Sequence, residues 1–140
     1  MEYDTIKQIH FFAMEVFVIG MITTLVAILL YAPRPLARRT GVLRLVRMCI
    51  FSLTSLAFLL VWVMGIWMAV SVGWYSEVWF WVKVVIVFFV IGAMHGRVSK
   101  QLRLAASEQD YAMPRDIVLM LPVLIIAVGV AVYLVVFKPF

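Results

Sequence analysis

The sequence predicts an all-α fold, a four-transmembrane-helix bundle, and three observations predict it. Hydrophobic residues make up 66% of the 140 residues, whereas soluble domains average ~45–50%. Four apolar runs each reach the ~20 residues that cross a bilayer. Basic residues concentrate in two stretches between these runs, as in proteins whose loop charges set the membrane topology. A chain of this length has room for one domain, so we expect a single integral-membrane domain over residues 1–140.

The first run covers residues 9–32 and follows the acidic residues Glu2 and Asp4. A secretory signal instead begins with a basic region and ends at a small-residue cleavage site. We therefore expect a retained transmembrane helix. Pro33 ends it, because proline cannot donate to the helix ladder.

Three further helices are expected over residues 48–72, 78–96 and 117–137. The short segment 73–77 joins the first two of these as an antiparallel hairpin. Residues 97–116 form the second basic stretch, and we expect its first residues to extend the third helix as a solvated turn or two.

The basic residues predict the orientation of the bundle. Nine Lys and Arg fall in the two stretches 33–47 and 97–116, whereas Lys7 and Lys138 lie on the opposite side. Cations concentrate in cytoplasmic loops, so we expect cytoplasmic basic loops and both termini outside (N-out/C-out). The same distribution accounts for the net charge without a nucleic-acid partner. The single cysteine, Cys49, excludes an intramolecular disulfide and a cysteine-based metal site.

Three ionisable residues are predicted to share the outer third of the membrane. His10 is expected at the outer membrane interface, and Glu15 roughly 8–9 Å deeper along the same helix. Lys83 is expected about 7–8 Å below the same membrane face on the third helix. An unpaired charge at that depth is costly, so Glu15 and Lys83 are expected to form an ion pair if the first and third helices touch. The alternative is that Lys83 extends its long stem to the interface.

His95 is predicted to be a separate group. It lies about 18 Å further along the third helix than Lys83 and is offset from it by ~120° around the helix axis. It is expected either as a functional group or as an interfacial polar residue beside Gly96 and Arg97. Depth alone prevents His10 and His95 from binding opposite sides of one haem.

His10 is a candidate axial ligand of a haem, because imidazoles on facing helices hold many transmembrane haems. Its partner must come from the outer third of another helix, where Met68 and Met64 offer thioethers, and His/Met ligation is chemically reasonable. The alternative use of these methionines is packing.

Aromatic residues gather around the turn between the second and third helices. They fit an interfacial aromatic belt, and they equally fit a wall for a flat ligand such as a porphyrin. The members are Trp67, Trp74, Tyr75, Trp79, Phe80 and Trp81.

Short motifs in three of the four predicted helices resemble those of one known family. The motifs are Ile6-Lys7-x-x-His10 with Ala13 and Gly20 after it, Trp79-x-x-x-Lys83 with His95 at the end of that helix, and the closing segment 135–140. In these residues, and in its length and layout, the chain resembles the HemJ-type protoporphyrinogen IX oxidases.

The resemblance implies a bacterial inner-membrane protein that binds haem b. It implies oxidation of protoporphyrinogen IX to protoporphyrin IX, with electrons passed to the respiratory chain and without direct use of oxygen. His10 and Lys83 match residues that the family's activity requires. We therefore expect His10 to bind the haem iron, with Met68 and His95 as further cofactor-binding candidates. Lys83 would pair with a propionate, and Glu15 would accept a proton or pair with Lys83.

Two other functions stay open at this point. One is a small structural subunit that stabilises a larger membrane complex, or assembles with copies of itself, and binds no cofactor. Small residues would then lie at helix contacts, and Gly20, Gly65, Ala69 and Gly129 are available. The other is a transporter or proton path through Glu15 and Lys83. The sequence shows neither the inverted repeat nor the discontinuous helix pair typical of transporters.

Overall fold

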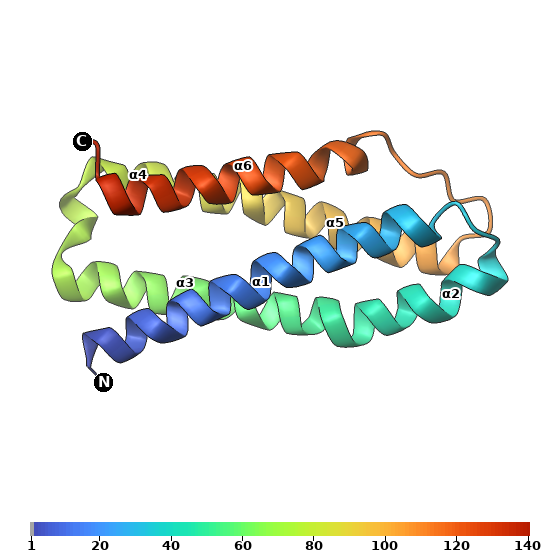
Figure 1. The fold of residues 1–140 in the computed structure, drawn as a ribbon, viewed down its shortest axis with the longest axis horizontal. Helices are drawn as coiled ribbons and strands as arrows, with labels where there is room; N and C mark the ends of the chain where they lie inside the picture. Colours follow the sequence, from blue (N-terminus) through green and yellow to red (C-terminus); the bar gives the residue numbers. More distant parts are fainter. Residues whose placement is uncertain (1) are drawn as a thin grey trace.

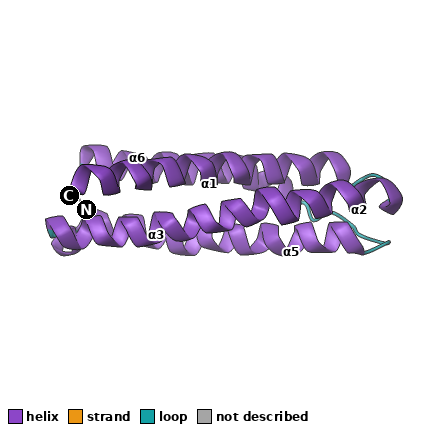
Figure 2. Ribbon diagram, turned by 90° about the horizontal axis from the view of Figure 1, so that it is seen from below, coloured by secondary structure: helices purple, strands orange, loops and turns teal. Residues whose placement is uncertain are grey.

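The computed structural model describes residues 2–140, and all regular structure in that range is helical (Figure 1). The helices run nearly antiparallel and form two layers when the bundle is seen along its side, with α1 and α6 in one and α3 and α5 in the other (Figure 2). The helical elements are α1 (Tyr3–Tyr31), α2 (Leu36–Leu45), η1 (Val46–Phe51), α3 (Ser52–Val72), η2 (Trp74–Ser76), α4 (Val78–Val85), η3 (Ile86–Gly92), α5 (Ala93–Ser107) and α6 (Asp116–Phe137).

These elements join into four helices that are long and apolar enough to cross a membrane. They cover residues 3–31, 36–72, 78–107 and 116–137. Large apolar side chains face outward along them, for example Phe12 with 68% of its surface exposed and Ile126 with 64%. Such a surface suits lipid rather than water. The predicted all-α bundle of four membrane-spanning helices is therefore confirmed, and the chain is a multi-pass membrane protein.

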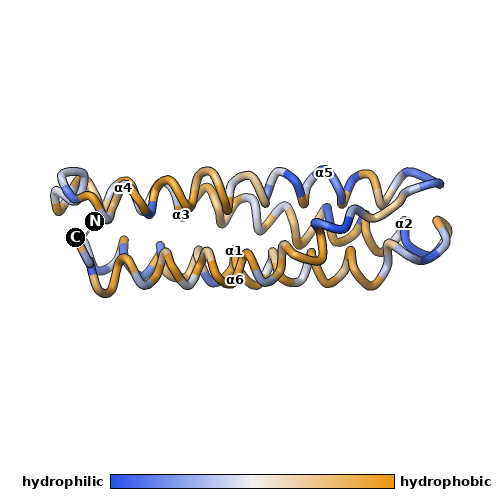
Figure 3. The backbone as a smooth tube through the Cα atoms, turned by 90° about the horizontal axis from the view of Figure 1, so that it is seen from above, coloured by the Kyte–Doolittle hydropathy of each residue, from blue (hydrophilic) through white to orange (hydrophobic). Residues whose placement is uncertain are grey.

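Three of the four helices are longer than the sequence predicts. The first begins at Tyr3 instead of residue 9, and the second begins at Leu36 instead of residue 48. The third continues past residue 96, as expected, and reaches Ser107. The expected basic loop is thus largely helical, because basic side chains do not interrupt the backbone hydrogen bonds of a helix that leaves the apolar region. Many of the hydrophilic positions gather at this end of the bundle, around α2 and α5, away from both termini (Figure 3).

Gly73 makes the hairpin between α3 and α4. It ends α3 with φ of 81°, a left-handed conformation that glycine adopts without a steric penalty, and its N–H donates to the Ala69 carbonyl at 3.0 Å. A single 3₁₀ turn follows, and Ser76 Oγ donates to the Gly73 carbonyl at 2.9 Å. The predicted antiparallel hairpin is present.

The helices α1 and α3 cross closely at Gly20. A Cβ at this position would lie 1.9 Å from Thr54 Oγ1, and Thr54 is buried. The Thr54 hydroxyl donates to the Ile50 carbonyl at 2.7 Å, which keeps it against its own helix. Glycine is therefore the residue that permits this crossing, as the expected use of small residues at helix contacts requires.

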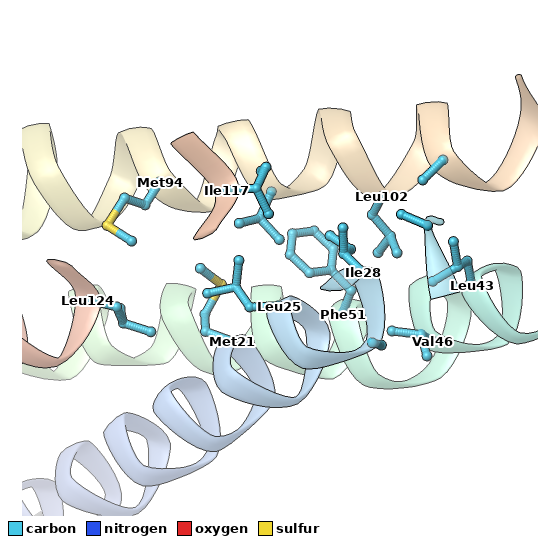
Figure 4. Packing of buried hydrophobic residues seen from close by; sticks show 14 of the residues in the cluster. Met21, Leu25, Ile28, Leu43, Val46, Phe51, Met94, Leu102, Ile117 and Leu124 are labelled. Carbon is cyan, nitrogen blue, oxygen red and sulfur yellow. The ribbon is translucent and has the colours of Figure 1, made fainter. Parts of the chain in front are cut away.

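The apolar core fills the half of the bundle farther from the termini. Side chains from all four membrane-spanning helices meet there, among them Leu25, Leu43, Leu102 and Ile117, each fully buried (Figure 4).

Arg39 joins the two inter-helix connections at the polar end. Its guanidinium is buried, and all five N–H donors bond to backbone carbonyls. Nε donates to Ala105 at 2.8 Å, one terminal nitrogen donates to Ala32 at 3.3 Å and Arg34 at 2.9 Å, and the other donates to Glu108 and Gln109. Since α1 and α5 end beside these carbonyls, the cation also complements two helix dipoles.

Tyr111 packs beside this arginine, with the Arg39 guanidinium 5.9 Å from the centre of its ring. The Tyr111 hydroxyl donates to Gln101 Oε1 at 2.8 Å. Burial raises the pKa of the Tyr111 phenol above its ordinary value, so this hydroxyl keeps its proton and the bond persists at neutral pH.

Candidate functional site

A large apolar pocket opens between the helices at the end of the bundle that holds the termini. It contains about 870 Å³ of open space, and α1, α3, α4 with η3, and α6 all contribute to its walls. There α1 packs on α3 and α4 packs on α6, while α4 packs directly against neither α1 nor α3. The pocket occupies the space between these two helix pairs.

His10 and Lys83 stand on opposite walls of this pocket. His10 comes from α1 and Lys83 from α4, and both also border a smaller neighbouring pocket of about 380 Å³. His10 is buried, with 6% of its surface exposed, and Lys83 is half-buried. The structure thus brings together the imidazole and the ammonium that the sequence placed in one outer site.

The His10 ring has an unsatisfied nitrogen. Its Nδ1 is buried and has no hydrogen-bond partner in the described part of the chain. Buried polar atoms are nearly always bonded, and each exception calls for an explanation. A Cβ at Gly65 would lie 3.2 Å from His10 Cε1 and 3.6 Å from Nδ1, so this glycine of α3 makes room for the edge of the ring.

Met68 borders the pocket from α3 and is buried. It lines the same pocket as His10, from the neighbouring helix. Met14 also lines the pocket, but from the same helix as His10, and Met64 does not line it. Within residues 2–140 no group of three or more His, Cys, Asp or Glu side chains could hold a bare metal ion.

The expected ion pair between Glu15 and Lys83 is wrong. Glu15 is exposed on the outer surface of α1, and across the described residues the single ion pair joins Arg97 to Asp116 at 3.0 Å. At ~100° per residue, Glu15 lies roughly 140° around α1 from His10, so it points away from the pocket that His10 faces. Helices α1 and α4 also fail to meet, because the pocket separates them.

The aromatic cluster divides into two groups. Trp74 lines the larger pocket, Phe80 lines the smaller one, and Trp79 is buried. Trp67, Tyr75 and Trp81 point outward, with 48%, 58% and 54% of their surfaces exposed. The first group forms part of the pocket wall, and the second has the exposure typical of an interfacial belt.

His95 lies beneath the pocket and does not line it. Its Nε2 is 3.0 Å from Ser55 Oγ, and its ring stacks against Phe51 and Phe58 with centroid distances of 4.7 and 5.4 Å. Phe58 and Phe17 both line the pocket. The ring of His95 therefore supports the pocket from below, and its position relative to the membrane interface stays a prediction.

The π-helix η3 explains why Lys83 and His95 lie on the same face. In a straight α-helix their offset would be ~120°. A π-bulge adds a residue to the helix and turns the residues after it back by roughly 100°, which leaves an offset of roughly 20°. Lys83, Val87 and Ile91 all line the pocket, and His95 continues this four-residue spacing.

Two parts of the site were not predicted from the sequence. Gly65 was expected only at a helix contact, and its role beside the His10 ring depends on where α1 crosses α3. Lys138 lies over the rings of Trp74 and Trp79, with its Nζ 5.1 and 5.5 Å from their centroids. The sequence signalled this contact only in that all three residues were predicted near the same membrane face.

The arrangement is suited to a flat, amphipathic, anionic ligand. Its walls are apolar and aromatic, one imidazole and one thioether face the interior, and Lys7 and Lys83 supply positive charge. Comparisons of the chain with known protein families, with curated proteins and with solved structures found no match. The function is therefore inferred from the site itself.

Proposed function

We propose that this chain is a HemJ-like membrane protein that binds haem b in the pocket and takes part in oxidising protoporphyrinogen IX to protoporphyrin IX. The observation that carries the proposal is the buried, unpartnered Nδ1 of His10 in a large apolar pocket that Met68 and Lys83 also line. The reaction itself is inferred from the motifs around His10 and Lys83, which resemble those of the HemJ-type oxidases.

The residues present fit a haem. Ligand pockets are mainly apolar with a few placed polar groups, and the lining here has that character, with His10 and Lys83 among apolar and aromatic side chains. An unsatisfied buried nitrogen costs about 1–3 kcal/mol. Coordination of a metal by Nδ1 would remove that cost, and the absence of a side chain at Gly65 leaves this edge of the ring uncrowded.

Each residue then has a definite task. His10 would bind the haem iron from α1, and Met68, which lines the same pocket from α3, is the candidate for a second ligand. Lys83 holds a propionate or the carboxylate of the substrate, since a charged hydrogen bond is stronger in an apolar site. The apolar walls exclude water. A bound haem would supply one-electron redox chemistry, and the respiratory chain would take the electrons. Glu15 has no part in this proposal, because it faces outward.

The proposed location is the bacterial inner membrane with both termini outside. The termini lie at the same end of the bundle (Figure 1), and the opposite end carries the basic residues of α2 and α5. The excess of Lys and Arg on that side supports its assignment to the cytoplasm. The pocket would then open in the outer leaflet.

A pair of histidine variants tests haem binding. His10→Ala, purified from haem-replete cells, should lack the Soret band that the parent protein shows. His95→Ala should keep it, because His95 lies outside the pocket lining and bonds to Ser55. Equal pigment in the parent and in His10→Ala would contradict the assignment of the ligand.

A second assay tests the reaction. Membranes that contain the protein should convert protoporphyrinogen IX to fluorescent protoporphyrin IX without oxygen when a respiratory acceptor is present. Lys83→Met should slow this conversion, whereas Lys100→Met at the opposite end should not. A rate in His10→Ala membranes equal to that of the parent would remove the enzymatic part of the proposal.

The exposed Glu15 favours a second candidate, a non-enzymatic subunit of a larger membrane complex. A charged residue on the lipid-facing surface of a membrane helix costs about 2.5–3.5 kcal/mol, which a basic residue on a neighbouring helix would offset. The chain should then copurify in fixed stoichiometry with a larger protein and carry no pigment, and Glu15→Gln should release that partner. Pigmented protein that runs alone would contradict this candidate.

A further inference from the structure

The end of α6 lies beside the pocket, at the end of the bundle that holds both termini (Figure 1). Lys138 follows the last residue of α6 and adopts φ 43° and ψ 60°, a left-handed conformation. Its N–H donates to the Leu134 carbonyl at 3.1 Å and closes the helix. A non-glycine residue rarely takes this conformation. The turn directs the tail toward the start of α4 (Figure 1).

Two tryptophans hold the Lys138 ammonium in place. Its Nζ lies 5.1 Å from the centre of the Trp74 ring and 5.5 Å from that of Trp79. The two rings meet edge to face at 5.4 Å. Cation–π attraction favours this place for the ammonium, although Lys138 itself is exposed. The ammonium therefore lies at one point, over the two rings, with its outer side open to water.

That point is at the mouth of the pocket. Trp74 lines the pocket, and so do Val135 and Val136 at the same end of α6. Tyr3 lines it as well and packs edge to face on Trp74 at 6.4 Å. The Lys138 charge thus lies against the outermost wall, whereas Lys83 stands within the pocket.

Lys7 and Lys83 line the pocket, Lys138 lies beside it, and none of the three has a carboxylate partner within residues 2–140. Such a set of cations suits a ligand that carries carboxylates on an apolar body. Lys138 can receive a carboxylate on its outer side and keep its contact with the rings, because the rings occupy only part of the ammonium's surface.

We propose that Lys138 is a second carboxylate-binding residue of the pocket, which holds one acidic group of a dicarboxylic tetrapyrrole at the mouth. This inference rests on the proposed function and adds a residue of the C-terminal segment to the site. Lys138 is a specificity-determining residue, since it favours the free acid over an uncharged ester of the same ring.

The test measures binding of protoporphyrin IX and of its dimethyl ester by quenching of tryptophan fluorescence. The full-length protein is placed in phosphatidylcholine nanodiscs, so that anionic lipids do not compete. Lys138→Gln should weaken binding of the free acid by up to about fivefold, as expected for an exposed ion pair, and should leave the ester unchanged. Lys138→Arg should keep most of the affinity, and Lys100→Gln should bind both ligands as the parent does.

The results of this test distinguish the role of Lys138 from the proposed function. Equal affinity of the parent and Lys138→Gln for the free acid would overturn this inference and leave the proposed function standing. An equal loss for acid and ester would also overturn it, because Lys138 would then act by packing the tryptophans. Efficient displacement of protoporphyrin IX by oleate would assign the site to a fatty acid instead. If the parent protein binds neither porphyrin, the proposed function is contradicted, and with it the proposed role of Lys138.

Discussion

Replacement of Arg39 by methionine should strongly destabilise the bundle. The guanidinium makes five hydrogen bonds to carbonyls of both inter-helix connections. Each bond to a charged donor contributes about 1.5–3 kcal/mol, but the bonds are not additive and freed carbonyls near the membrane surface can take up water. Loss of one partner of a buried charged network costs about 3–5 kcal/mol, and we expect that range for Arg39→Met.

The assay is thermal unfolding of purified protein in detergent, where this loss corresponds to a fall in Tm of about 10 °C. Arg38→Met is the matched control, since Arg38 is exposed and its side chain makes no hydrogen bond within residues 2–140. Arg39→Lys should fall between the two, because an ammonium has three donors instead of five. Equal Tm values for the two methionine variants would refute the reasoning.

Two further substitutions test the pocket and the helix crossing. Gly65→Ala should lower the affinity for haem about tenfold, because the new methyl group would lie 3.2 Å from the His10 ring. The control is Gly129→Ala, whose methyl group would contact nothing within 4 Å. This variant should bind haem as the parent protein does in the same titration. Gly20→Ala should destabilise the protein by about 1–3 kcal/mol through overpacking, and Thr54→Ala in the same chain should recover part of that loss in thermal unfolding. If the losses of stability caused by Gly20→Ala and Thr54→Ala simply add in the double variant, the two residues are not in close contact where α1 crosses α3.

The number and membrane-spanning character of the helices could be predicted because hydropathy reports them directly. The positions of His10, Met68 and Lys83 at one end of the bundle also followed from counting residues along each helix at ~1.5 Å per residue. Depth can therefore be predicted from the sequence, and these three residues line one pocket in the structure.

Position around the helix axis was harder to predict. The Glu15–Lys83 pair was inferred from depth alone, although Glu15 lies roughly 140° from His10 on α1. The offset between Lys83 and His95 was calculated for a straight helix, and η3 cancels most of it. A π-bulge has no clear sequence signature, so the sequence alone could not have corrected this error.

Contacts made where helices end could not be predicted from the sequence either. Arg39 looked like one of several loop arginines, since its partners are carbonyls, which every residue carries. The contact of Lys138 with Trp74 depends on the left-handed turn after α6. Both features arise from how the helix ends meet, which the local sequence does not specify.

The central claim is that the pocket binds haem through His10, and the most direct test is the absorption spectrum of the protein purified from haem-replete cells. We predict a Soret band that shifts between the oxidised and reduced states, with a pigment content of about one haem per chain, as one pocket with one buried imidazole requires. Pure, folded protein without Soret absorbance would contradict the claim.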